Sequence, residues 1–124
     1  MPFTITWEKR GAVTSYYGIV DFHEVFEADL HFNSDPRSDN ARYQIIDFTQ
    51  ATPGVVDEDE IKYIAAMDYG ASLSIHRLNL ALVAIDPYIR KLCNQYINKC
   101  MKKNMTWKFM LFEDMESARI WAAS

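Results

Sequence analysis

The sequence predicts an α/β fold in which four helices cover both faces of a mostly parallel sheet of four to five strands. Short apolar runs alternate with helical patterns along the chain, and this alternation is typical of right-handed crossovers between parallel strands. The runs Tyr43–Phe48 and Asn79–Ile85 suit strands that are covered on both faces. With 124 residues, 49% hydrophobic and 24% charged, the chain is expected to form one domain over residues 1–124.

The first two strands are predicted to form an N-terminal hairpin. Phe3–Trp7 alternates between apolar and polar residues, and Ala12–Val20 is rich in β-branched and aromatic side chains. The turn Glu8–Gly11 between them is short, which favours antiparallel pairing. The hairpin is therefore expected to add an antiparallel edge to the sheet.

The first helix is expected to begin after Asp21, which is a typical N-cap residue. Glu24 follows three residues later, close to the capping-box pattern. Asp29 falls on the apolar face of this helix by the 3.6-residue period. The apolar members of that face are Phe22, Val25, Phe26 and Phe32. The polar segment 33–40 contains Pro36 and is expected to end the helix as a loop.

The stretch Arg42–Glu60 is the centre of the predicted fold. Its strand is expected to cover Arg42–Phe48, and a helix is expected from about Asp57 into residues 71–75. The acidic residues that open this helix favour the positive end of its dipole. Between strand and helix lies a connection that carries Thr49, Thr52, Pro53 and Gly54. Ligands of open α/β sheets bind outside the carboxyl ends of the strands, so we expect the site of this protein here.

The second half of the chain continues the alternation of strands and helices. We expect strands at Asn79–Ile85 and Thr106–Phe112, and helices from Pro87 to about Lys103 and from Asp114 to Ala122. Asp86 precedes the first of these helices as an N-cap, with a proline at the first helical position. The predicted order is β-β-α-β-α-β-α-β-α.

Composition and charge argue against several classes of function. The formal net charge is −4, whereas a broad nucleic-acid surface needs a basic balance. No apolar run approaches the ~20 residues that span a bilayer, and no basic region followed by an apolar run opens the chain. We therefore expect a cytoplasmic protein. Because Gly-x-Gly-x-x-Gly, P-loop and Gly-x-Ser-x-Gly motifs are absent, we expect no cofactor and assign no catalytic residue.

The cysteines and histidines show no ligand spacing for a metal. Cys93 and Cys100 lie about 10 Å apart along one predicted helix, which is too far for a disulfide. We interpret them as two small buried apolar side chains. His23, His31 and His76 are interpreted as solvated.

Several local patterns resemble a known family. They are the strand end Tyr16–Val20 that leads into a helix, the segment Ser34–Arg37, the strand end Ile45–Phe48, and the segment Phe112–Trp121 with its acidic turn and Ala-x-x-Trp helix. In this order they resemble the SpoIIAA-like proteins of the STAS superfamily, in the STAS/SEC14-like branch. The resemblance covers nearly the whole chain and implies a SpoIIAA-like fold.

The anti-sigma-factor antagonists of that superfamily carry a phosphorylatable Ser or Thr, typically within Asp-Ser-Ser or Asp-Ser-Thr. It stands at the start of the helix after the strand that matches Ile45–Phe48. Here that position reads Val56–Glu60, where Asp57 matches the family's Asp and carboxylates replace the hydroxyl residues. Thr52 is the nearest hydroxyl. The acidic run would repel an incoming phosphate, so we interpret it as a helix start, with a permanent mimic of the phosphorylated state as the alternative.

The candidate ligand or partner site gathers polar residues at strand ends and at the helix start: Asp47, Thr49, Thr52, Asp57, Glu58 and Asp86. We predict a non-enzymatic regulatory or protein-interaction module, whose partner is another protein or a second copy of this chain. A second copy would form a homodimer joined through a sheet edge or a helix face. The first alternative is a domain that binds a small apolar ligand or a lipid, as SEC14-like relatives do. The second is a hydrolase that uses Asp47 and Asp86, although an N-cap role already explains Asp86.

Asp29 and Asp68 are unusual because each falls on the apolar face of its helix. A buried carboxylate without a partner is costly, so each needs a partner, a raised pKa or a place at a solvated margin. The candidate partners are Arg37, Arg42, His76 and Arg77.

Aromatic side chains are concentrated in the first third of the chain, and most of them are expected in the core. A small apolar pocket is the alternative use of these side chains. Its predicted lining is Tyr16, Tyr17, Phe22, Phe26 and Phe32, with Met67 or Tyr69.

Overall fold

The computed structural model describes residues 2–124, and within them five strands form one sheet whose spatial order follows the chain. The strands are β1 (Phe3–Glu8), β2 (Gly11–Val20), β3 (Tyr43–Pro53), β4 (Asn79–Val83) and β5 (Lys108–Phe112). β1 pairs with β2 in antiparallel fashion, and β2 to β5 are all parallel. The predicted α/β fold, with its antiparallel hairpin at one edge, is therefore confirmed.

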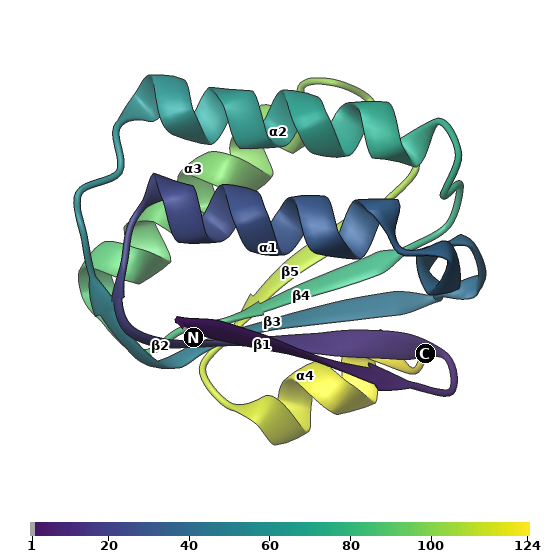
Figure 1. The fold of residues 1–124 in the computed structure, drawn as a ribbon, viewed down its shortest axis with the longest axis horizontal. Helices are drawn as coiled ribbons and strands as arrows, with labels where there is room; N and C mark the ends of the chain where they lie inside the picture. The colour runs from purple at the N-terminus through teal and green to yellow at the C-terminus, as the bar shows by residue number, and fades with distance from the viewer. Residues whose placement is uncertain (1) are drawn as a thin grey trace.

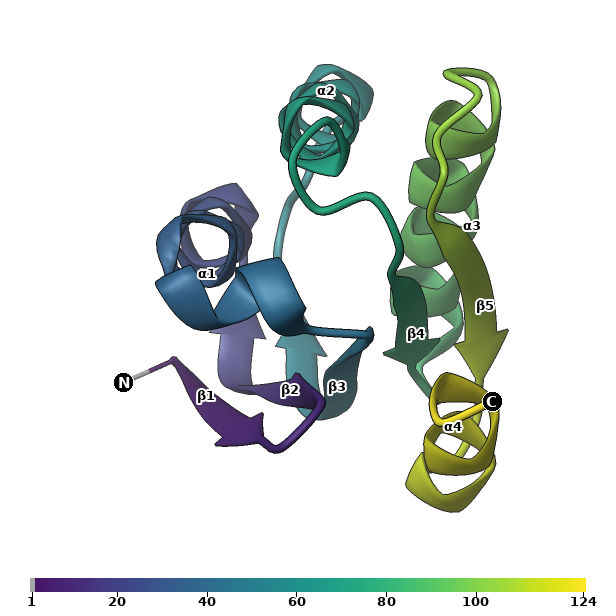
Figure 2. The ribbon, with the colours of Figure 1, turned by 90° about the vertical axis from the view of Figure 1, so that its right-hand side faces the viewer.

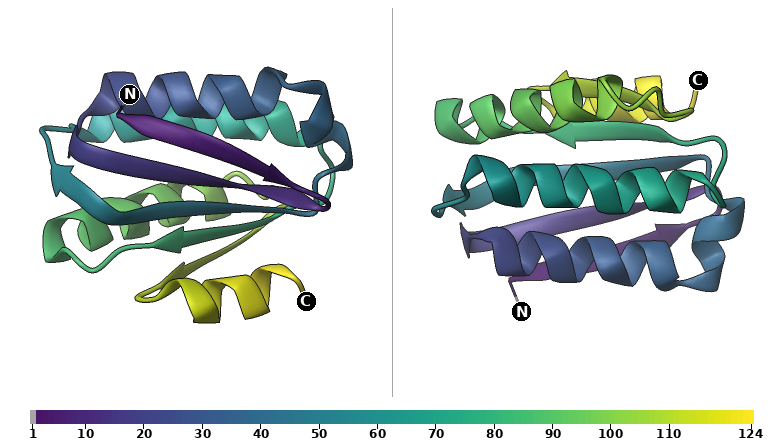
Figure 3. Two further views of the ribbon diagram at one scale, coloured as in Figure 1. Left: turned by 60° about the horizontal axis from the view of Figure 1, so that its bottom comes forward. Right: turned by 90° about the horizontal axis from the view of Figure 1, so that it is seen from above.

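Three helices cover one face of the sheet and the last helix covers the other (Figures 1 and 2). The helices are α1 (Phe22–Ser34), α2 (Glu58–Ser72), α3 (Pro87–Met101) and α4 (Met115–Ala122). Because the parallel strands lie in chain order and their crossovers are right-handed, the three crossover helices must fall on the same face. Figure 3 shows them side by side across the sheet.

Each of these helices begins at an aspartate N-cap, a role that the sequence predicts for Asp21 and Asp86. Asp21 and Asp57 form full capping boxes with the glutamates three residues later. Asp86 and Asp114 accept hydrogen bonds from the backbone of the first turns of α3 and α4. An N-cap of this kind stabilises a helix by ~1 kcal/mol. These four aspartates therefore help to define where the four helices begin.

The larger core lies between the sheet and the three crossover helices. Trp7 stacks on the fully buried Phe32 with a ring-centroid distance of 5.4 Å, which joins β1 to α1. The Trp107 Nε1–H group donates a hydrogen bond of 2.6 Å to the Ile75 carbonyl oxygen inside the same core. A smaller core lies between α4 and the opposite face of the sheet, where Ile45 packs among its buried residues. The two cores place α1, α2 and α3 over the face that carries the buried polar groups described below.

Strand β3 differs from the prediction because it continues past Phe48 to Pro53. Its extension pairs with the far end of β2, from Tyr17 with Gln50 to Val20 with Pro53, after a shift in register between Ser15 and Tyr17. The predicted connection through Thr49 and Thr52 is therefore wrong, since both threonines lie within the strand. The hydrogen-bonding partner of this extension is a distant strand, and for that reason local sequence patterns miss it.

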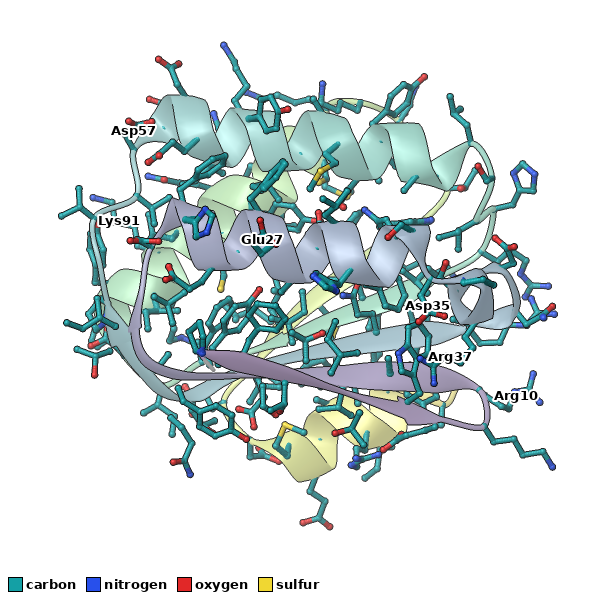
Figure 4. All side chains as sticks on the ribbon, in the orientation of Figure 1. Arg10, Glu27, Asp35, Arg37, Asp57 and Lys91 are labelled. Atoms are coloured by element: carbon teal, nitrogen blue, oxygen red, sulfur yellow. The ribbon has the colours of Figure 1, made fainter. Side chains whose placement is uncertain are left out.

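Segment 33–40 also differs from the predicted loop. Helix α1 runs to Ser34, and a short 3₁₀ helix, η1 (Pro36–Asn40), follows it. Asp35 caps η1, and its carboxylate pairs with the Arg37 guanidinium at 2.8 Å (Figure 4). The Arg37 guanidinium also lies 4.6 Å from the centre of the Trp7 ring. Proline at the first helical position explains why Pro36 begins a helix here and does not only end one.

Candidate functional site

The polar residues predicted at the carboxyl ends of the strands make local backbone contacts. Asp47 Oδ1 accepts a hydrogen bond of 2.9 Å from the Thr49 backbone N–H group. Asp86 Oδ2 accepts hydrogen bonds of 3.0 Å from the backbone N–H groups of Tyr88 and Ile89. These contacts give each carboxylate a structural role in its own element, and the hydrolase hypothesis gains no support from them.

The acidic start of α2 is a capped and exposed helix end. Asp57 Oδ1 accepts a hydrogen bond of 2.8 Å from the Glu60 N–H group. Glu58 is exposed and pairs with Lys99 of α3 at 3.1 Å. Figure 4 shows Asp57 at the end of α2 that lies near the carboxyl ends of the strands, with Lys91 at the same end of the molecule.

Three apolar side chains are exposed at the carboxyl ends of adjacent parallel strands. Ile19 is 69% exposed at the end of β2, Val55 is 85% exposed after β3, and Ile85 is 63% exposed after β4. We call Ile19, Val55 and Ile85 the carboxyl-edge surface. The backbone at Gly54 is close to the end of β2 there, since a Cβ built on Gly54 would lie 2.5 Å from the Val20 carbonyl oxygen. The sequence carries no periodic signal for this surface, because its three residues come from separate segments of the chain.

A buried polar cluster connects the three crossover helices. Asp68 of α2 is 2% exposed, and its Oδ2 accepts a hydrogen bond from the Tyr96 hydroxyl of α3. Its Oδ1 accepts a hydrogen bond of 3.2 Å from the Asn33 side-chain amide of α1. Asp29, also on α1, is 7% exposed. Both carboxylates predicted on apolar faces are therefore buried.

The prediction that basic side chains pair with these carboxylates is wrong. Arg37 pairs with Asp35 at the surface, and Arg42, His76 and Arg77 are exposed. In place of a positive charge, neutral groups on α1 and α3 donate hydrogen bonds to Asp68. Burial, the negative charge of Asp68 and a hydrogen bond between the two carboxyl groups raise the pKa of Asp29 well above its ordinary value.

A cavity of about 110 Å³ lies between this cluster and the sheet. Its lining is mostly apolar and comes from β2, β3, β4 and the three crossover helices. Of the residues predicted to line a pocket, Tyr16 and Phe22 do so. The other predicted members, Tyr17, Phe26, Phe32, Met67 and Tyr69, are not part of the lining. Phe32 is in the core, and Tyr17 and Tyr69 are exposed.

The polar end of this cavity carries acceptor atoms without hydrogen-bond partners. Thr14 is 1% exposed and Gln44 is 2% exposed, and both line the cavity from the sheet. Thr14 Oγ1, Gln44 Oε1 and Asp29 Oδ2 are buried and have no partner within the described residues. Sequence reasoning finds Asp29 by its helical period but misses Thr14 and Gln44, which are ordinary residues of a strand.

Other kinds of site find little support in residues 2–124. No group of three or more His, Cys, Asp or Glu side chains in this range is placed to hold a metal ion. His31 is exposed and lies 3.7 Å from the Glu27 carboxylate. No helix in the described range is both long and apolar enough to cross a membrane.

Solved structures of the SpoIIAA type match the whole arrangement, although no protein-family model and no curated protein sequence matches the chain. The anti-sigma factor antagonist SpoIIAA in its unphosphorylated form superposes with a TM-score of 0.64 at 13% identity, over 98% of this chain and 97% of that one. The Bacillus cell fate determinant SpoIIAA in its phosphorylated form gives 0.61 at 12% identity, over 98% and 99%.

An uncharacterised Shewanella loihica protein with a SpoIIAA-like fold also superposes, with a TM-score of 0.55 at 10% identity, over 97% of this chain and 91% of that one. A likeness at such low identity concerns the fold alone. The chain therefore has a SpoIIAA-like fold, as the sequence resemblance implies.

Proposed function

We propose that this protein is a non-enzymatic regulatory module that binds a protein partner at the carboxyl ends of its parallel strands. The observation that carries the proposal is the carboxyl-edge surface, whose three apolar side chains are each more than half exposed. Three adjacent strands that each leave a large apolar side chain exposed near the carboxyl end offer apolar contacts to a protein partner. A SpoIIAA-like fold supports the same class of function, because the matching structures include an anti-sigma factor antagonist.

Charge near this surface favours a partner with basic side chains. Asp57 and Asp59 are exposed at the start of α2 and Asp21 at the start of α1, while the exposed Glu58 pairs with Lys99. Opposite charges across an interface speed association and select the partner. Because Glu58 stands where a phosphorylatable hydroxyl would be, we propose that the interaction does not depend on phosphorylation at this position.

Capture of the partner by immobilised protein tests this function. The paired change Val55→Glu with Ile85→Glu places charge on the carboxyl-edge surface, and Ile120→Glu is the matched control on α4, where Ile120 is 70% exposed. We expect the paired variant to retain about tenfold less partner than wild type, since one buried apolar contact is worth ~1.4 kcal/mol or more. Retention of the same partner by the paired variant, or its loss in Ile120→Glu, would overturn the proposal.

Self-association is a second form of the same proposal. Strand β1 is at the edge of the sheet and pairs only with β2 among the described strands. An exposed edge can pair with a second copy of the chain. Light scattering over a range of concentrations measures this directly, and a monomer at every concentration would remove the homodimer while leaving the separate protein partner in place.

A small-ligand function is a second candidate, and the cavity is the observation that favours it. At about 110 Å³ it is smaller than the ~150 Å³ engineered cavity that binds benzene, so it suits a small apolar molecule and not a long-chain lipid. Cytosolic location is part of both proposals.

A further inference from the structure

The cavity has an apolar end and a polar end. Phe22 and Ile61 line it from the first turns of α1 and α2, at the carboxyl ends of the strands. Asp29 and Asp68 line it about two helical turns further along the same helices. A molecule that fills the cavity therefore meets apolar side chains along its body and carboxyl groups at its inner end.

The groups that lack a partner at the polar end are all able to accept hydrogen bonds. Gln44 Oε1 is an acceptor, Asp29 Oδ2 accepts when its carboxyl group is ionised, and Thr14 Oγ1 can accept as well as donate. Each belongs to a side chain that is more than nine-tenths buried. Leaving a buried polar atom unpaired costs ~1–3 kcal/mol, so this end of the cavity favours an occupant that brings several donors.

The polar end of the cavity holds the carboxyl groups of Asp29 and Asp68, and burial beside Asp68 raises the pKa of Asp29 and so disfavours its charged form. No arginine, lysine or histidine is among the described residues that line the cavity. Asp68 already accepts hydrogen bonds from Asn33 and Tyr96, both neutral donors. A cation would supply the positive charge that the pair Asp29 and Asp68 lacks, whereas a carboxylate would be repelled.

We infer that the cavity binds a short primary alkylammonium ion, with its apolar body against Phe22 and Ile61 and its ammonium group bound by Asp29, Gln44 and Thr14. An ammonium group has three donors and no acceptor, which matches the three unpartnered groups. The volume of about 110 Å³ limits the body to about four carbon atoms by comparison with benzene in its ~150 Å³ cavity. The inference rests on the small-ligand function and names the chemical class of that ligand.

Calorimetric titration with three ligands of the same size tests this inference on the full chain. The ligands are n-butylammonium chloride, n-butanol and sodium butyrate. We expect n-butylammonium to bind at least about tenfold more tightly than n-butanol, and butyrate not to bind. Equal binding of n-butanol and n-butylammonium would overturn the ammonium inference while the small-ligand function stands. If none of the three binds, the cavity takes no ligand of this size, and the ammonium inference and the small-ligand function both fail.

Two variants and one control locate the binding. Asp29→Asn is nearly isosteric and should weaken n-butylammonium binding at least about tenfold while leaving n-butanol unchanged. Asp39→Asn, in the exposed η1 segment, is the matched control and should change neither. Val25→Phe adds volume to the lining and should abolish binding of both ligands, which keeps the site testable if Asp29→Asn does not fold. Unchanged n-butylammonium binding in Val25→Phe would overturn the assignment to this cavity.

Discussion

The Tyr96 hydroxyl donates a hydrogen bond to Oδ2 of Asp68, and this buried contact joins α3 to α2. The same carboxylate accepts a hydrogen bond from Asn33 of α1, so one aspartate connects all three helices on that face of the sheet. A buried carboxylate that lost one of these donors would keep its desolvation cost without compensation. The first prediction tests this relationship.

Removal of the Tyr96 hydroxyl should destabilise the fold. Tyr96→Phe keeps the ring, which packs at 5.7 Å from the Phe109 ring, but leaves Asp68 Oδ2 without its donor. We expect the free energy of unfolding in urea to fall by ~1–3 kcal/mol. Tyr88→Phe is the control, because Tyr88 is exposed in the first turn of α3 and should change stability by less than ~0.5 kcal/mol. Equal effects of the two changes would contradict the role given to Tyr96.

We expect the titration of Asp29 to lower the free energy of unfolding as pH rises. Its pKa is raised in the folded protein, chiefly by burial and by Asp68, whereas in the unfolded chain it is near ~3.9. Below that value both states keep the proton and the contribution of Asp29 is fully present. Above it the unfolded chain releases the proton first, so stability is lost up to and through the raised pKa, with a slope of at most ~1.4 kcal/mol per pH unit.

Asp29→Asn removes this titration and should flatten the corresponding part of the profile. The variant should therefore gain stability relative to wild type as pH rises from ~4 toward neutrality. Urea unfolding at a series of pH values measures both profiles. Parallel profiles for the two proteins would show that Asp29 does not titrate differently in the folded and unfolded states.

Two glycines should respond to alanine in opposite directions. A Cβ at Gly54 would lie 2.5 Å from the Val20 carbonyl oxygen, so Gly54→Ala must displace the backbone and should cost ~1–3 kcal/mol. A Cβ at Gly70 would have no neighbour within 4 Å, and Gly70 lies inside α2. Gly70→Ala should therefore stabilise the protein by ~0.5–1 kcal/mol. Thermal unfolding of both variants measures the difference, and the same sign for both would contradict the geometry.

Both cysteines should be unreactive in the folded protein. Cys93 and Cys100 are free and buried, and burial raises the pKa of each thiol to about 12. Since the thiolate is the reactive form, we expect a thiol reagent to modify neither residue at neutral pH, and both in guanidinium chloride. The time course of modification with and without denaturant gives the answer. Rapid reaction of one thiol without denaturant would indicate that the helix which carries it opens locally.

Features that depend on near neighbours in the chain were predictable. The N-caps Asp21 and Asp86, the hairpin and the buried apolar strands come from interactions within a few residues or from a simple period, and the structure has all of them. The buried positions of Asp29 and Asp68 were also predictable, because the 3.6-residue period places each on an apolar face. Their partners were not, since Tyr96 lies on another helix.

The sequence by itself determined the order of the elements and the face that each helix buries, because capping and periodicity are local properties of the chain. Only the tertiary structure decided that β3 extends to Pro53, that Tyr96 meets Asp68, and that a cavity remains beside Asp29. Each of these depends on how distant segments pack, and packing distances are not encoded in any single segment. The carboxyl-edge surface is of the same kind, because Ile19, Val55 and Ile85 come from strands that neighbour one another only in the folded sheet.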